Sequence, residues 1–196
     1  IPNGVDTKFF YPLGNRTIDN IFRFIFVGRL HSQKNLIYLL DQVLLFKKKL
    51  NNNFTLEIIG NGPQKKELIQ HSEKIGLKNN VLWTDWVNKR QLLQKYQSAD
   101  CLLLPSLYEG MSNVILESMA CGLPVVASDI SANRAVIKNG KNGFLFNINR
   151  PFQLQKAMEL LVVNQKKRKE IGSSARDFVV REFSWDLVAK RYLKLL

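Results

Sequence analysis

The sequence alternates between six short apolar runs and longer segments in which apolar residues recur with helical spacing, and this alternation constrains the fold most. Several runs are almost continuously apolar, as is typical of strands buried on both faces of a parallel sheet. Strands that alternate with helices predict an α/β fold, and right-handed crossover connections then give parallel strands. We therefore expect a Rossmann-like, doubly wound parallel sheet of six strands. The expected strands span residues 22–27, 54–59, 81–86, 101–104, 124–127 and 143–146.

Helices are expected between and after these strands. Pro63 suits the first turn of a helix, where its missing N–H is not needed. Ser184 suits the N-cap of the last helix, and Phe183 can pack against Val188 there. The expected helices span residues 35–50, 63–75, 89–99, 112–120, 152–163 and 167–182, with the final one beginning at 184.

The length of 196 residues and the hydrophobic content of 45% allow one domain with a substantial core. The Pro- and Gly-containing segment 1–20 shows little periodicity, so we expect an interdomain linker there, a Rossmann-like domain over 21–183 and a C-terminal helix over 184–196. Because the chain opens on Ile1 without a leader pattern, we interpret its start as an internal cut. Its apolar runs fall short of the roughly 18 residues that predict a membrane span.

The formal net charge of +13 allows two interpretations. It can attract an anionic partner, such as nucleic acid, a phosphorylated ligand or anionic lipid. Alternatively, the lysines only solvate outer helix faces, which their scattered distribution favours; the densest runs are 47–49 and 166–169. We expect no nucleic-acid partner, because a Walker loop, a zinc pattern and an aromatic-studded basic strand are all missing from the sequence.

Two cysteines, Cys101 and Cys121, lie in apolar stretches outside any C-x-x-C pair, and the two histidines are far apart. The sequence therefore predicts no metal site, and reduced core cysteines of a cytosolic protein.

The loop after the first expected strand is basic. In an open parallel sheet of order 3-2-1-4-5-6, ligands bind at the carboxyl ends of the first and fourth strands, where the order reverses. Gly28 permits a tight turn at the end of the first strand. Arg29 can donate two parallel hydrogen bonds to phosphate oxygens, and Lys34 can attract the phosphate as a single positive charge. The alternative is a pair of exposed loop cations in weak surface contacts, and these residues alone favour neither interpretation.

The loop after the fourth expected strand leads directly into a helix, whose unpaired N–H groups and dipole form an anion site. Gly110 lets a ligand approach the backbone. Glu109 precedes the helix and Glu117 lies within it, so a pyrophosphate at the helix start would separate the two carboxylates, one facing a sugar and the other a ribose. The alternatives are that Glu109 is a helix-dipole charge and Glu117 a surface acid.

Two further loops are candidates for the pocket wall. Gly60 and Gly62 form a tight turn after the second strand, and a purely structural turn explains them equally well. Trp86 and Val87 can offer backbone groups to a base edge, although Trp86 fits a core position at least as well. His31 lies between the two cations, and we expect it to be exposed.

Together these segments resemble the group 1 glycosyltransferases, a family of retaining enzymes with the two-domain GT-B fold. Residues 1–6 resemble the family's linker, residues 26–30 with Lys34-Asn35 its phosphate-binding segment, and residues 59–63 its second glycine loop. The most specific likeness is 105–128, where Glu117 follows Glu109 after eight residues; residues 183–185 also fit.

The resemblance implies that the chain is the donor-binding C-terminal half of such an enzyme. Arg29 and Lys34 would neutralise the diphosphate of the leaving nucleotide, so that no metal or other cofactor is needed. Glu109 would contact hydroxyls of the donor sugar, and Glu117 would bind the ribose. Backbone amides would hold sugar and phosphate around Gly110, Met111, Ser112 and Asn113.

The implied substrate is a nucleotide-diphosphate sugar of the UDP or GDP type. The acceptor-binding N-terminal domain would be missing, so we expect these residues to bind nucleotide weakly and to transfer no sugar alone. The resemblance also implies synthesis of a cell-surface polysaccharide or lipopolysaccharide in the cytoplasm, with the basic surface touching the inner face of the membrane. One departure is Ala135, which stands where the family often has a glutamate.

Three alternatives stay open at this point. The first is another GT-B enzyme, such as a nucleotide-sugar epimerase or a phosphorylase. The second is a basic nucleic-acid-binding domain, which only the net charge suggests. The third is a non-catalytic sensor of nucleotide sugars.

Overall fold

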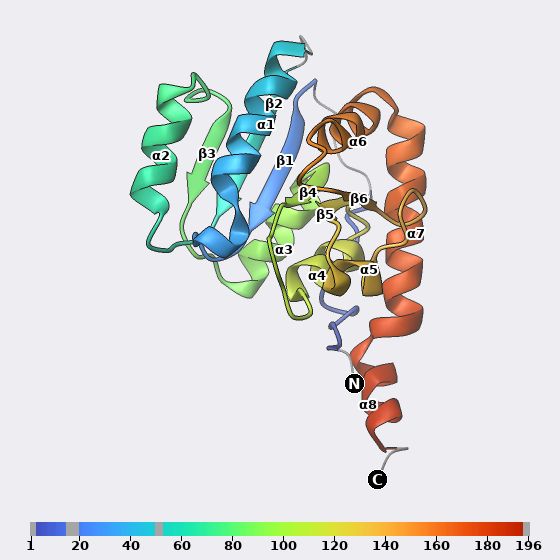
Figure 1. Cartoon of the computed structure of the whole chain (residues 1–196). Helices are drawn as coiled ribbons and strands as arrows, with labels where there is room; N and C mark the ends of the chain where they lie inside the picture. Colours follow the sequence, from blue (N-terminus) through green and yellow to red (C-terminus); the bar gives the residue numbers. More distant parts are fainter. Residues whose placement is uncertain (1–2, 15–19, 50–52, 194–196) are drawn as a thin grey trace.

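The computed structural model describes residues 3–14, 20–49 and 53–193, and its centre is a six-stranded parallel sheet of order β3-β2-β1-β4-β5-β6 (Figure 1). Both the expected fold class and the expected strand order are confirmed. The strands are apolar and mostly buried on both faces, because helices cover the two sides of the sheet. They are β1 (Phe22–Val27), β2 (Phe54–Ile59), β3 (Val81–Thr84), β4 (Cys101–Leu104), β5 (Val125–Ser128) and β6 (Phe144–Phe146).

The helices form a layer on each side of the sheet. Helix α1 packs beside α2 and α6, and α4 packs beside α7. Figure 1 shows α7 running along one side of the molecule into α8, which projects beyond the other helices. The helices are η1 (Ser32–Lys34), α1 (Leu36–Lys49), α2 (Lys65–Lys74), α3 (Lys89–Ser98), α4 (Asn113–Ala120), α5 (Ser131–Val136), α6 (Phe152–Val163), α7 (Gln165–Phe183) and α8 (Trp185–Leu193).

Most elements lie within two residues of their expected ranges, and three of the differences have a structural explanation. Strand β3 ends at Thr84, because Asp85 leaves the sheet and its carboxylate accepts hydrogen bonds from Asn61 (3.2 Å) and Lys65 (2.6 Å). Helix α2 begins two residues after Pro63, following a turn. Helix α5 was not expected, since six residues are too few for a recognisable apolar stripe.

The opening segment packs onto the domain over its described part, residues 3–14. Val5 and Phe10 are buried in the main hydrophobic core. The Arg176 guanidinium donates hydrogen bonds to the carbonyl oxygens of Phe10 (2.7 Å), Thr7 (3.0 Å) and Ala120 (2.7 Å). The expected linker therefore contributes side chains to the same core as the sheet; residues 1–2 and 15–19 of it lie outside the described residues.

Both cysteines are buried and free, in agreement with their expected role as reduced core residues. Burial raises the pKa of the Cys121 thiol to about 12. Among the described helices, none is long and apolar enough to cross a membrane.

Candidate nucleotide-binding site

The exit loops of β1 and β4 lie against each other at the carboxyl edge of the sheet, because these two parallel strands are neighbours. The backbone N–H of Leu107 donates to the carbonyl oxygen of Gln33 (2.9 Å). In return, the Gln33 side-chain amide donates to the carbonyl oxygen of Tyr108 (2.8 Å). The two loops are thus joined by reciprocal hydrogen bonds at the point where the strand order reverses.

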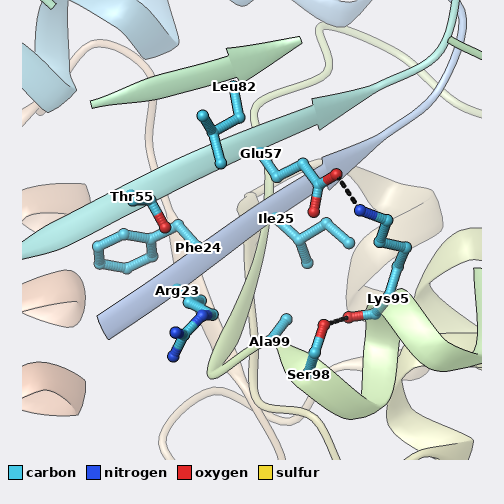
Figure 2. A pocket seen from close by; sticks show the side chains of 9 residues that line it. All are labelled: Arg23, Phe24, Ile25, Thr55, Glu57, Leu82, Lys95, Ser98 and Ala99. Atoms are coloured by element: carbon cyan, nitrogen blue, oxygen red, sulfur yellow. Dashed lines mark hydrogen bonds and ion pairs between the residues drawn. The ribbon is translucent and has the colours of Figure 1, made fainter. Parts of the chain in front are cut away.

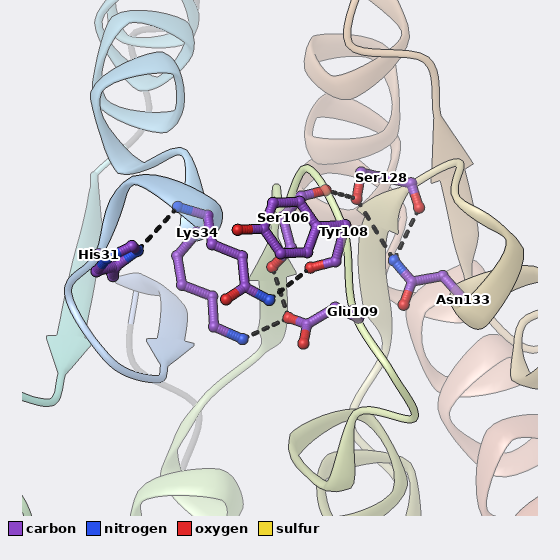
Figure 3. A network of polar contacts seen from close by, with 8 residues as sticks. His31, Lys34, Ser106, Tyr108, Glu109, Ser128 and Asn133 are labelled. Atoms are coloured by element: carbon purple, nitrogen blue, oxygen red, sulfur yellow. Dashed lines mark hydrogen bonds and ion pairs between the residues drawn. The ribbon is translucent and has the colours of Figure 1, made fainter.

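Lys34 and Glu109 form an ion pair between these loops (Figure 3). Their side chains are only 15% and 10% exposed, so the pair is largely shielded from water. Oxygen Oε1 of Glu109 accepts hydrogen bonds from both the Lys34 ammonium and the Ser106 hydroxyl (2.7 Å for Ser106). Within the described part of the chain, no hydrogen bond reaches Oε2, which leaves this oxygen available to a ligand.

The local backbone turns Lys34 toward Glu109. Residues 32–34 form the single 3-10 turn η1, and the His31 side chain accepts a hydrogen bond from the Gln33 N–H at its start. Asn35 closes the turn in the left-handed region (φ 54°), a conformation that asparagine tolerates better than most residues. His31 itself is exposed, as expected.

Buried polar residues support Glu109 from behind (Figure 3). Ser128 donates its hydroxyl to the carbonyl oxygen of Ser106 (2.5 Å), and the Asn133 amide donates to the carbonyl oxygen of Ser128 (2.8 Å). All three residues are buried. The sequence pattern does not reveal them as site residues, because nothing local distinguishes a serine or asparagine in a buried network from one in an exposed loop.

Arg29 lies on the same loop but is not drawn into this network. Its side chain is exposed, and no hydrogen bond or ion pair of its guanidinium occurs among the described residues. Of the two expected cations, the structure therefore brings only Lys34 to Glu109. Arg29 can still swing toward an anion bound at the loop, since no described residue holds its guanidinium.

The glycines of the first two exit loops pack backbone against backbone. A Cβ on Gly60 would lie 2.0 Å from the carbonyl oxygen of Gly28, and a Cβ on Gly62 would lie 2.4 Å from that of Leu30. Gly60 also has φ +144°, which side chains disfavour. The β2 loop thus supports the β1 loop, and this packing accounts for both of its glycines.

The start of α4 presents unpaired backbone donors. The N–H groups of residues 110–113 make no hydrogen bond to any other described residue. Ser112 is buried and precedes the helix without capping it through its side chain, while Asn113 is exposed. Met111 packs partly against the core, and Gly110 has open space around it. Such a helix start favours an anion or a group of hydroxyl oxygens.

Glu117 lies four residues after Asn113 in α4, and its hydrogen-bond partner differs from those of Glu109. The hydroxyl of Tyr96, which is fully buried, donates to its Oε2 (3.1 Å). Burial raises the pKa of Glu117, and the Tyr96 hydrogen bond and the charge of Lys89 partly oppose that shift. Tyr96 is therefore a positioning residue for Glu117 that the sequence pattern did not reveal.

Trp86 and Val87 follow β3 at the same edge of the sheet. Trp86 is 59% exposed, so it is not the core residue that the alternative interpretation described. Val87 packs partly against the core. Their loop adjoins the β2 loop through the hydrogen bond that the Asn61 amide donates to the Asp85 carboxylate.

A cavity of about 210 Å³ lies elsewhere, between α3 and the β1–β2 face of the sheet (Figure 2). Glu57 is one of its lining residues, and its carboxylate pairs with Lys95 (2.5 Å) and accepts a hydrogen bond from the Thr84 hydroxyl (2.6 Å). None of the predicted site residues lines this cavity. Nor do the described residues contain a group of three metal-ligating side chains.

The fold and the site define a Rossmann-like domain whose two central exit loops and helix start meet at the switch point of the sheet, as in nucleotide-binding domains. A family model of glycosyl transferases group 1 matches residues 15–178. The chain belongs to this family, which confirms the likeness seen in its motifs.

Relatives and solved structures agree with this assignment. The chain is 31% identical to a UDP-Gal:alpha-D-GlcNAc-diphosphoundecaprenol alpha-1,3-galactosyltransferase of Escherichia coli, over 100% of the chain and 52% of that protein. It is also 31% identical to an uncharacterized glycosyltransferase of Methanocaldococcus jannaschii, over 85% of the chain and 42% of the relative. The chain therefore spans about half the length of these relatives.

A crystal structure of similar extent also matches. It is the C-terminal domain of a glycosyl transferase group 1 family protein, LpcC, from Francisella tularensis. The TM-score is 0.83 at 25% identity, and the match covers 93% of this chain and 100% of that one.

Proposed function

We propose that this chain binds a nucleotide-diphosphate sugar, of the UDP or GDP type, as the donor-binding half of a retaining hexosyltransferase. The observation that carries the proposal is the contact of Lys34 with Glu109, which unites the basic β1 loop with the start of α4. The galactosyltransferase relative, whose name specifies UDP-Gal, supports a UDP sugar as the donor.

Each part of the site has a proposed task. Lys34 and Arg29 neutralise the diphosphate as it leaves, and the N–H groups of residues 110–113 hold phosphate and sugar oxygens. Glu109 accepts hydrogen bonds from sugar hydroxyls through Oε2, while Glu117 binds the ribose. Gly28, Gly60 and Gly62 form the pocket wall, and Trp86 and Val87 offer backbone groups to the base. With two cations and a helix start facing the diphosphate, the reaction needs no metal in this scheme.

The acceptor is proposed to be a glycan or lipid-linked sugar, in the synthesis of cell-surface polysaccharide or lipopolysaccharide in the cytoplasm. Acceptor contacts and further catalytic groups would come from an N-terminal domain outside these residues. The relatives support this division, because each of them is about twice as long as the part that this chain matches. Transfer would retain the anomeric configuration, because the acceptor would attack from the same face of the sugar that the leaving group departs from, through an ion-pair-like step. These 196 residues alone would then bind donor nucleotide without transferring sugar.

Calorimetric titration with UDP, GDP and ADP tests the proposal. We expect heat of binding with at least one of them, and Arg29→Ala should weaken that binding about tenfold, or roughly 1.4 kcal/mol, because a phosphate loses its mobile cation. Arg181→Ala, which removes an exposed arginine from α7, is the matched control and should bind like the unsubstituted chain. A folded sample that binds none of the three nucleotides would contradict the proposal.

We also propose a peripheral contact with anionic membrane through the lysine-rich ends of α1 and α7, which lie at the same end of the molecule in Figure 1. Lys48 and Lys169 are exposed there. In vesicle flotation, the chain should bind phosphatidylglycerol but not phosphatidylcholine vesicles, and Lys48→Glu with Lys169→Glu should reduce binding severalfold. Lys190→Glu, on α8, is the control. Equal flotation with both lipids would refute the contact.

A further inference from the structure

The segment Asn3–Val5 is held firmly against the junction of α7 and α8. Val5 is buried, its N–H donates to the carbonyl oxygen of Phe183 (2.8 Å), and its own carbonyl oxygen accepts from the N–H of Trp185 (3.1 Å). At Gly4, an added Cβ would lie 2.8 Å from two atoms of the Trp185 ring, so ring and backbone are in direct contact. These contacts determine where Asn3 lies.

Asn3 reaches the start of α4 from this position. Its side-chain amide donates to Oδ1 of Asn113 (3.0 Å), and its backbone N–H lies 3.1 Å from Sδ of Met111. Both partners belong to the turn whose N–H groups have no hydrogen-bond acceptor among the described residues. The two asparagines are 110 residues apart in the sequence, so the contact depends entirely on the packing of the opening segment.

The orientation of the Asn113 amide follows from this contact. Because Oδ1 accepts from Asn3, the amide is held with Nδ2 directed away from Asn3, and Nδ2 donates no hydrogen bond to any described residue. Because Asn113 is the first residue of α4, this side-chain donor adds to the backbone N–H groups of residues 110–113. It suits the same ligand chemistry, namely phosphate or sugar oxygens.

We propose that Asn3 is a positioning residue for the donor site, which presents Nδ2 of Asn113 to the oxygens of the bound nucleotide-diphosphate sugar. The inference rests on the proposed function for the nature of the ligand. It assigns to the opening segment a part in ligand recognition, where the sequence had suggested only a connection between domains.

A double-mutant cycle on this chain, with UDP as the probe, tests the inference. Asn3→Ala should weaken UDP binding about three- to fivefold, and Asn113→Ala by the same factor or more. The double variant should bind no more weakly than Asn113→Ala alone, since Asn3 acts only through Asn113. Thr7→Ala, in the same segment, is the control and should leave UDP binding unchanged.

Thermal unfolding and side-chain NMR separate positioning from a general loss of structure. Asn3→Ala should keep the melting temperature within about 2 °C, because its contacts are exposed, and should shift the side-chain amide resonances of Asn113. Unchanged UDP binding in Asn3→Ala, or additive effects in the cycle, would overturn the inference while the proposed function stands. If the unsubstituted chain binds no nucleotide, the proposed function fails, and the inference fails with it.

Discussion

Gly60→Ala is expected to lower the free energy of unfolding by about 3 kcal/mol, through steric overlap and an unfavourable backbone conformation together. The new Cβ would lie 2.0 Å from the carbonyl oxygen of Gly28, and the residue would keep φ +144°. Backbone atoms cannot move aside as a flexible side chain can, so the exit loops of β1 and β2 would have to separate. For a chain of this size, the melting temperature should fall by roughly 6 to 12 °C.

Gly110→Ala is the matched control for this prediction. A Cβ on Gly110 meets no atom within 4 Å, so this variant should melt within about 2 °C of the unsubstituted chain. Differential scanning calorimetry of the three proteins is the measurement. Equal melting temperatures for Gly60→Ala and Gly110→Ala would show that the exit loops of β1 and β2 are not packed against each other as described.

Lys34→Ala should destabilise the fold by about 2 to 4 kcal/mol, because it leaves the Glu109 carboxylate in a shielded position without a cation. Glu109→Ala should have a similar effect on the unpaired Lys34 ammonium. The double variant should lose less stability than the two single losses added together, with a coupling of about 2 kcal/mol. Urea unfolding of the four proteins measures each free energy.

The pair formed by Lys49 and Glu159 provides the control, since it has the same two residue types at 53% and 32% exposure. Water and salt screen such a pair, so Lys49→Ala should change the free energy of unfolding by no more than about 0.5 kcal/mol. If Lys34→Ala proves as mild as Lys49→Ala, the ion pair at the site does not hold the two loops together.

This pair also bears on how the proposed site would work. In the structure, Lys34 and Glu109 neutralise each other, so an incoming diphosphate meets a lysine that already has a carboxylate partner. Ser106 gives Glu109 a second hydrogen bond on the same oxygen, so the carboxylate keeps a partner if Lys34 turns toward phosphate. Loss of the Ser106 hydroxyl would remove that support.

The sequence by itself determined the order of elements and the edge of the sheet at which the site lies. Apolar periodicity is a local property, and right-handed crossovers leave few ways to connect six parallel strands. Errors at this level were small, as at Trp86, which leaves the sheet because the Asp85 carboxylate accepts hydrogen bonds from Asn61 in the β2 loop and Lys65 at the start of α2. The exit loops that carry Lys34 and Glu109 could be predicted for the same reason.

Only the tertiary structure decided which of these side chains meet. Lys34 rather than Arg29 pairs with Glu109, across 75 residues of sequence, because η1 turns it inward. Three other sets of hydrogen bonds likewise join distant segments. They are the Ser106–Ser128–Asn133 network, the hydrogen bond of Tyr96 to Glu117 and that of Asn3 to Asn113. A local pattern carries no information on such contacts, since each depends on a few ångströms of packing between elements that the chain brings together only when it folds.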